Sequence, residues 1–189
     1  MKLIQRTDYP WDGKITLGQA EQSEFALRFR IPGWAAGATL KVNGTPSAVD
    51  IEVGTYASLE RTWRAGDTVE LTLPMRARLV QANPMVEELR GQVAVMRGPL
   101  VYCLESVDLP EGVNVMDVRL PRRINLQPRY DEQLLGGLVV LEGEAVAVTD
   151  PDWPAGSYDS PVLYKEVART EPDRLRLTLI PYHAWSNRG

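Results

Sequence analysis

Cysteine and histidine are nearly missing from this chain of 189 residues, which contains one of each, Cys103 and His183. A single cysteine cannot form a disulfide within the chain, and it leaves a cysteine-based zinc site without enough ligands. It is compatible with a reducing compartment such as the cytoplasm, although it does not determine location. In a Ser-His-Asp arrangement, His183 would have to be the base, because it is the single histidine. No G-x-S-x-G sequence supplies the serine nucleophile.

Long apolar runs and concentrated basic charge are lacking as well. No stretch approaches the 18 apolar residues that would predict a membrane-spanning helix, and the first residues contain no apolar segment typical of a signal peptide. The chain has 21 basic and 25 acidic residues and a net charge of −4. This balance argues against a nucleic-acid partner, because such proteins usually carry a basic face. Dinucleotide, phosphate-loop and H-E-x-x-H motifs do not occur.

Short apolar segments separated by turn-forming residues dominate the sequence instead. Residues 23–31 (SEFALRFRI) alternate between apolar and polar side chains, which is the period of a half-buried strand. No segment keeps a helical period, and the 15 glycines and 14 prolines interrupt the chain at intervals that would break helices. The pattern predicts further strands at residues 38–42, 56–63, 68–73, 92–96, 100–105, 137–141, 144–149 and 174–180.

Glycines mark the turns between these segments. Asn43-Gly44 and Glu142-Gly143 stand between pairs of predicted strands, and Gly66 lies in the short segment 64–67 (RAGD) before another. Hairpin turns often need a positive φ, which glycine adopts without steric penalty. The sequence therefore predicts positive φ at Gly44, Gly66 and Gly143.

The spacing of the strands predicts an all-β fold of two consecutive antiparallel β-sandwich units, jelly-roll-like in style. The alternation stops between residues 74 and 88, so we place the boundary there, with a first domain at residues 1–76 and a second at 77–189. The first unit begins abruptly, and we expect part of its sheet to lie outside this chain.

Paired carboxylates are the remaining source of catalytic chemistry, because glycosidases use two of them across the scissile bond. Close pairs in the sequence are Glu87 and Glu88, Glu105 and Asp108, and Asp50 and Glu52. With 25 acidic residues such pairs arise by chance, and we interpret them as surface carboxylates. Aspartates at 150, 152 and 159 could offer oxygens to calcium, but a turn-forming role fits them better. The sequence thus predicts neither catalytic residues nor a metal site.

Tryptophan supplies the most suggestive binding candidates. The five tryptophans are Trp11, Trp34, Trp63, Trp153 and Trp185. Trp34 and Trp63 follow or end strands and are expected in the core or at a sheet edge. Trp11 and Trp153 stand in Pro-containing turns and are the better candidates for exposure. There an indole could stack on a sugar ring, so these two are the candidate carbohydrate-binding residues, although packing against another domain is the favoured interpretation of both.

Six phrases, in this order, resemble the C-terminal part of glycoside hydrolase family 127, the β-L-arabinofuranosidase-like proteins. Each phrase is weak alone, but the ordered set covers nearly the whole chain. The phrases are residues 9–13 (YPWDG), 30–34 (RIPGW), 42–44 (VNG), 61–67 (RTWRAGD), 97–105 (RGPLVYCLE) and 180–189 (IPYHAWSNRG).

The resemblance implies an architecture in which a catalytic (α/α)₆ barrel is followed by two β-sandwich domains. It also implies that zinc is held in that barrel by cysteines and a glutamate, with a zinc-bound cysteine as nucleophile. Nothing in this chain matches that motif, and Cys103 resembles a small buried hydrophobe rather than the nucleophile. We therefore expect no cofactor in this chain, with zinc belonging to the catalytic domain that it lacks.

Three functions stay open at this point. The first is a structural and interaction module that supports the missing barrel and contributes to a homodimer. The second is a carbohydrate-binding module that uses Trp11 and Trp153. The third is a self-sufficient enzyme with an unrecognised site. We expect the chain alone to be inactive, and we expect neither nucleic acid nor membrane among its partners.

Overall fold

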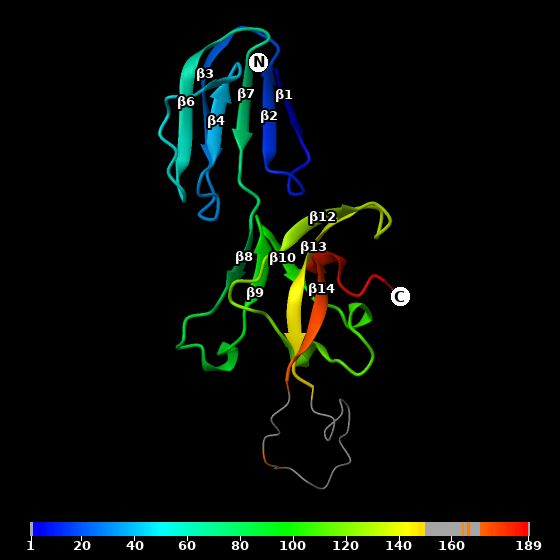
Figure 1. Cartoon of the computed structure of the whole chain (residues 1–189). Coiled ribbons are helices and arrows are strands. Elements are labelled where there is room, and N and C mark those ends of the chain that lie inside the picture. Colours follow the sequence, from blue (N-terminus) through cyan, green and yellow to red (C-terminus); the bar gives the residue numbers. More distant parts are fainter. Residues whose placement is uncertain (1, 150–163, 165, 167–170, 189) are drawn as a thin grey trace. The chain divides into compact units, whose positions relative to one another are not determined.

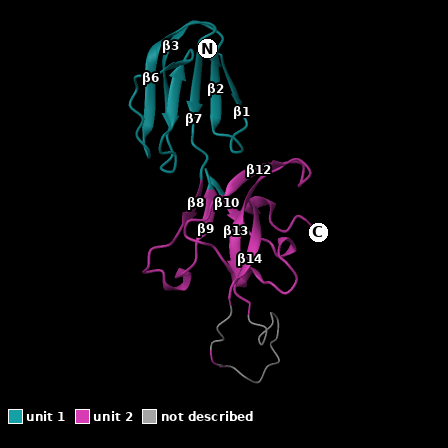
Figure 2. Cartoon of the chain, in the orientation of Figure 1, with its two compact units in different colours: residues 1–76, 97–100 teal, residues 77–96, 101–189 magenta. Residues whose placement is uncertain are grey.

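The computed structural model describes residues 2–149, 164, 166 and 171–188, and the chain forms two compact units (Figure 2). Unit 1 contains Met1–Arg76 together with Arg97–Leu100, and unit 2 contains Ala77–Met96 and Val101–Gly189. The regular elements of the described residues are antiparallel strands and four short 3₁₀ helices. The predicted all-β, sandwich-type fold is therefore confirmed. In this part of the chain no helix has the length and apolar character needed to cross a membrane.

Unit 1 is built from two antiparallel sheets (Figure 1). The larger sheet has the strand order β1–β2–β7–β4–β5, and the smaller one pairs β3 with β6. The bounds are β1 (Leu3–Thr7), β2 (Lys14–Gln19), β3 (Ser23–Arg30), β4 (Thr39–Val42), β5 (Thr45–Pro46), β6 (Tyr56–Trp63) and β7 (Thr68–Thr72). The predicted strands at 23–31, 38–42, 56–63 and 68–73 are all present. β1 was not predicted, since all five of its residues are exposed and it shows no apolar alternation.

The core of unit 1 follows from strand alternation. Leu40 pairs with Leu71 in the larger sheet, which places both side chains on the same face. In the smaller sheet β6 buries Leu59 and Trp63, and β3 buries Phe29. The core consists of Phe29, Ile31, Ala35, Ala38, Leu40, Ala57, Leu59, Trp63, Val69, Leu71 and Leu73.

Two turns of unit 1 depend on glycine. Asn43 and Gly44 both have positive φ, 52° and 79°, as a two-residue hairpin between β4 and β5 requires. Gly66 has φ 90° in the turn that leads into β7. The carboxylate of Asp67 holds this region, because it accepts the Arg64 backbone N–H at 2.9 Å and the Asn43 side-chain amide at 2.8 Å. These hydrogen bonds lower the pKa of Asp67. The predictions for Gly44 and Gly66 are confirmed.

We expect Gly66→Val to destabilise the protein by about 1–2 kcal/mol, because a β-branched residue is strained at positive φ. The space around Gly66 is open, so steric contact would add nothing to this loss. Urea denaturation followed by circular dichroism measures the change. Gly33→Val is the matched control: Gly33 also has open space but no positive φ. Equal stability of the two variants would contradict the turn assignment.

Unit 2 contains a seven-stranded sheet in the order β11–β13–β14–β10–β9–β8, with β12 also paired to β13. The bounds are β8 (Ala77–Val80), β9 (Ala94–Arg97), β10 (Leu100–Cys103), β11 (Val118–Arg119), β12 (Gln127–Asp131), β13 (Leu138–Ala147) and β14 (Asp173–Pro181). The 3₁₀ helices are η1 (Glu87–Leu89), η2 (Ser106–Asp108), η3 (Val115–Asp117) and η4 (Tyr182–Ala184). β14 pairs with β13 over most of its length and with β10 only at its end, which links the two halves of the sheet.

The predicted hairpin at Glu142-Gly143 is wrong. β13 runs unbroken from Leu138 to Ala147 and lies beside β14 (Figure 1). Gly143 is not in the left-handed region; instead a Cβ there would lie 3.0 Å from Leu126 and 3.1 Å from the Asn125 carbonyl oxygen. This glycine allows a neighbouring segment to approach the strand closely, a second common reason for glycine in a sheet.

The core of unit 2 lies along β13 and β14. The first four residues of β13 are all buried, so both faces of the strand are covered there. The most buried apolar side chains of this core are Val140 and Leu141 in β13 and Leu177 and Ile180 in β14. The hydroxyl of Tyr102 donates to the Val139 carbonyl at 2.9 Å and ties β10 to β13.

Candidate functional site

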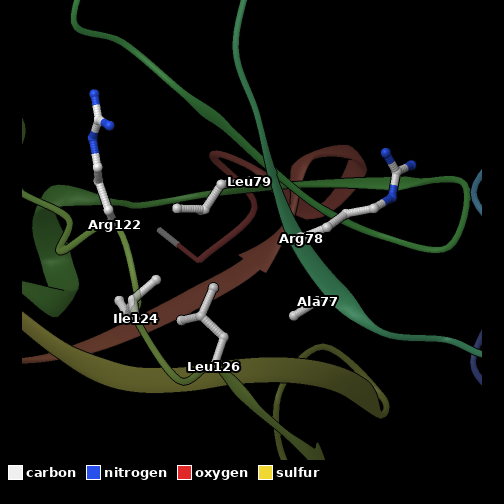
Figure 3. Close-up of a pocket in the computed structure, with 6 residues that line it drawn as sticks. All are labelled: Ala77, Arg78, Leu79, Arg122, Ile124 and Leu126. Atoms are coloured by element: carbon white, nitrogen blue, oxygen red, sulfur yellow. The ribbon is translucent and has the colours of Figure 1, made fainter.

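A cavity of about 320 Å³ in unit 2 lies between β8 and the segment before β12 (Figure 3). Leu79, Ile124 and Leu126 lie around it, whereas Arg78 and Arg122 extend their guanidinium groups away on different sides. The volume suits a small ligand, but its lining contains no carboxylate, thiol or imidazole. This cavity cannot supply an acid and a base for hydrolysis from its own walls.

A second cavity, of about 260 Å³, lies in unit 1 along β1, β2 and the Gly66 turn. Asp67 is the one carboxylate in its lining. That carboxylate already accepts hydrogen bonds from Arg64 and Asn43, and these lower its pKa. A general acid for glycoside hydrolysis needs a raised pKa, so Asp67 has the opposite character.

Of the three carboxylate pairs in the sequence, the structure brings one into a shared interaction. Asp50 and Glu52 lie in the loop between β5 and β6. Glu87 and Glu88 belong to the exposed η1, where Glu87 pairs with Arg90. Glu105 and Asp108, in contrast, both contact Arg188.

The Glu105–Asp108–Arg188 network is the most buried cluster of charges among the described residues. Glu105 is 7% exposed, and it accepts the Ser186 backbone N–H at 2.7 Å as well as Arg188 Nε. Arg188 Nη1 donates to Asp108 Oδ1 at 2.8 Å, and Nη2 binds Oδ2 of the same carboxylate. The hydrogen bonds to Asp108 first, and those to Glu105 next, raise the pKa of Arg188. Because both carboxylates are engaged and neither lines a cavity described above, their geometry is that of a structural anchor.

Cys103 lies next to this network at the end of β10. Burial raises the pKa of its thiol, and the charge of Glu105 adds to the effect. A nucleophilic or zinc-binding cysteine needs the opposite shift, toward the thiolate. In the part of the chain that the structure describes, no three His, Cys, Asp or Glu side chains gather closely enough to hold a metal ion. The residues that the structure describes therefore do not fit the zinc site that the family resemblance implies for the catalytic domain.

The two tryptophans predicted to bind carbohydrate have different outcomes. Trp11 is half-buried in unit 1, where its carbonyl accepts the Arg97 guanidinium at 3.0 Å. Trp153 lies outside the described residues, as does the aspartate cluster considered for calcium. The carbohydrate-binding role of both indoles stays a prediction.

An exposed aromatic pair at the end of β14 was missed by the sequence reasoning. Tyr182 and Trp185 stack with ring centroids 5.9 Å apart and planes inclined by 6°. The only signal was the aromatic phrase around His183, and it gives no information on exposure. His183, the one histidine, is exposed on the same 3₁₀ turn, η4.

Models of two protein domains match the chain end to end. Residues 1–75 match the domain described as "Beta-L-arabinofuranosidase, GH127 middle domain", and residues 77–189 match the glycoside hydrolase family 127 C-terminal domain.

Individual proteins similar to this chain belong to the same class of enzymes. A non-reducing end β-L-arabinofuranosidase of Bifidobacterium longum subsp. longum is 38% identical over 97% of this chain. A solved structure described as a glycoside hydrolase shares 40% sequence identity over 99% of the chain, with a TM-score of 0.88. The structure of a family 127 β-L-arabinofuranosidase of Geobacillus stearothermophilus T6 shares 38% sequence identity over 99% of the chain, with a TM-score of 0.83. The chain spans 28%, 30% and 28% of these three proteins, less than a third of each. It belongs to glycoside hydrolase family 127, of which it carries the middle and C-terminal domains.

Proposed function

We propose that this chain is the accessory β-sandwich region of a β-L-arabinofuranosidase-like enzyme, which packs on the catalytic barrel and stabilises it without taking part in bond cleavage. The observation that carries the proposal is the match of both domain models to a chain that spans less than a third of its relatives. In this proposal hydrolysis, with the zinc ion expected for it, belongs to the part of the longer protein outside this chain.

The chemistry of the described residues supports an accessory role. The Glu105 and Asp108 carboxylates are bound to Arg188, and Asp67 is bound to backbone and amide donors. The thiol of Cys103 is kept protonated by burial. These four groups are thus engaged or in the wrong protonation state for acid, base or nucleophilic catalysis.

A chimera tests the proposal. This chain replaces the homologous region of the Bifidobacterium longum enzyme, and it is compared with the same enzyme truncated before that region. We expect the chimera to be soluble and to hydrolyse an aryl β-L-arabinofuranoside, because the sandwiches cover apolar surface of the barrel that truncation would expose. Light scattering on the chimera also measures whether it forms a dimer, as the family resemblance implies.

Two results would contradict the proposal. One is a truncated enzyme as stable and active as the chimera, since the sandwiches would then contribute nothing to the barrel. The other is turnover of the aryl arabinofuranoside by this chain alone, with zinc and a thiol reductant present, which persists after repurification. The isolated chain is therefore the control in the same assay.

A second candidate function, carbohydrate binding, is favoured by one observation, the exposed Tyr182–Trp185 stack. It is compatible with the accessory role, because a module can support a catalytic domain and also hold substrate near it.

A further inference from the structure

Tyr182 and Trp185 form a stacked aromatic pair on unit 2. Their rings lie nearly parallel, with planes 6° apart and centroids 5.9 Å apart. Tyr182 is 57% exposed and Trp185 is 54% exposed, so more than half of each residue faces solvent. In an offset stack the outer face of each ring stays accessible. Large aromatic side chains so exposed often mark a binding surface.

The turn that carries these rings is fixed by backbone hydrogen bonds and by a buried residue. The Trp185 backbone N–H donates to the Tyr182 carbonyl at 3.1 Å, and Ala184 between them is buried. Ser186 follows with φ 61°, a left-handed conformation that is uncommon for residues other than glycine. Its N–H donates to Glu105.

Two residues further along the chain, Arg188 completes the attachment. It binds Glu105 and Asp108, so the turn is fixed to the η2 segment by charge-assisted hydrogen bonds. The aromatic surface is therefore preorganised: its two rings are fixed before any ligand arrives, which reduces the entropy lost on binding.

The chemistry of this surface selects its ligand. The charged groups that hold this turn, Glu105, Asp108 and Arg188, are bound to one another, so an ionic ligand gains little from them. A sugar ring fits better, because its C–H face is apolar while its hydroxyls stay in water or bond to polar neighbours. His183, Ser186 and Asn187 are exposed beside the rings.

We propose that the Tyr182–Trp185 stack is a carbohydrate-binding surface that holds a furanose or pyranose ring of an arabinose-containing glycan by stacking, outside any catalytic site. The sugar class rests on the proposed function, whereas the stacking site rests on the geometry of the two rings.

The test is a titration of the full chain with methyl β-L-arabinofuranoside and with a short arabinofuranosyl oligosaccharide, by calorimetry and saturation-transfer NMR. We expect dissociation constants of about 1–10 mM, as for a small ligand on an open surface. Arabinitol is the ligand control, because it carries similar hydroxyls without a ring face. Trp185→Ala should weaken binding about tenfold, and Trp185→Phe should retain most of it. Both variants should keep the parent melting temperature, since Trp185 is exposed.

Trp11→Ala tests the tryptophan that the sequence offered as a sugar-binding candidate, and loss of binding in this variant would move the site to Trp11. Loss confined to Trp185→Ala supports the proposal. Absence of saturable binding, binding that survives Trp185→Ala, or binding of arabinitol as strong as that of the sugar would overturn it. A chimera destabilised by Trp185→Ala, without sugar binding, would assign the surface to a protein contact instead. The accessory role is decided by the chimera and needs no free sugar, so the two proposals can fail separately.

Discussion

Replacing Trp63 with alanine should destabilise unit 1 by about 3–5 kcal/mol, as expected for a large aromatic side chain lost from a core. Trp63 is 1% exposed at the end of β6. It stacks on Phe25 with centroids 5.7 Å apart, and its indole N–H donates to the Phe25 carbonyl at 3.0 Å. The substitution therefore opens a cavity and leaves a carbonyl without its donor. Much of the stability of a domain this small would be lost.

Hydrogen exchange with peptide resolution measures this effect, because it reports on unit 1 and unit 2 separately. We expect faster exchange in β3, β6 and β7, with the strands of unit 2 little changed. Trp63→Phe is the control: it keeps the stacked ring but removes the N–H donor, and it should cost less than Trp63→Ala. A loss below about 1 kcal/mol for Trp63→Ala would show that this indole is not a core residue.

Replacing Arg188 with methionine should destabilise unit 2 by about 3 kcal/mol, the effect expected when one partner of a buried ion pair is removed. Glu105 would stay at 7% exposure without its cation, and Asp108 would lose its bidentate partner. The turn that carries Tyr182 and Trp185 would lose its attachment through Arg188 and keep the Ser186 N–H bond to Glu105. Urea denaturation measures the stability, and sugar titration of the same variant should show weakened binding.

Two variants separate charge from geometry at this network. Arg188→Lys keeps the charge but not the two parallel hydrogen bonds to Asp108, so an intermediate loss is expected. Adding Glu105→Gln to Arg188→Met should recover part of the stability, because the buried charge is removed with its partner. The network raises the pKa of Arg188 above an already high ordinary value. Its contribution is fully present below that value, so the loss should not change between about pH 6 and pH 10. A loss that disappears within this range would contradict the assignment.

Much of the fold could be predicted from the sequence, because the inward residues of several strands alternate visibly. The pattern Phe25, Leu27, Phe29 in β3 is an example: these side chains face the core of unit 1. The turn glycines Gly44 and Gly66 were also predicted, since a left-handed turn restricts the residue type locally. β1 shows where this reasoning stops, because an edge strand with every residue exposed carries no alternation.

Gly143 shows a different limit of the local pattern. Glu142-Gly143 has the composition of a hairpin, but in the structure it lies in the middle of β13. Glycine fits at this position because Leu126 and Asn125 pack against it from another segment. A residue chosen for a close approach of this kind cannot be told from a turn glycine when only its neighbours in sequence are known.

The sequence by itself determined the all-β class, most strands and the membership of family 127, because these depend on alternation, turn chemistry and ordered phrases. Only the tertiary structure decided which polar and aromatic residues act together. Glu105 and Arg188 are 83 residues apart and meet because β10 pairs with the end of β14. Trp63 and Trp185 are the same residue type, yet one is buried and the other is exposed. Exposure and long-range pairing arise from how strands pack, so residue identity does not reveal them.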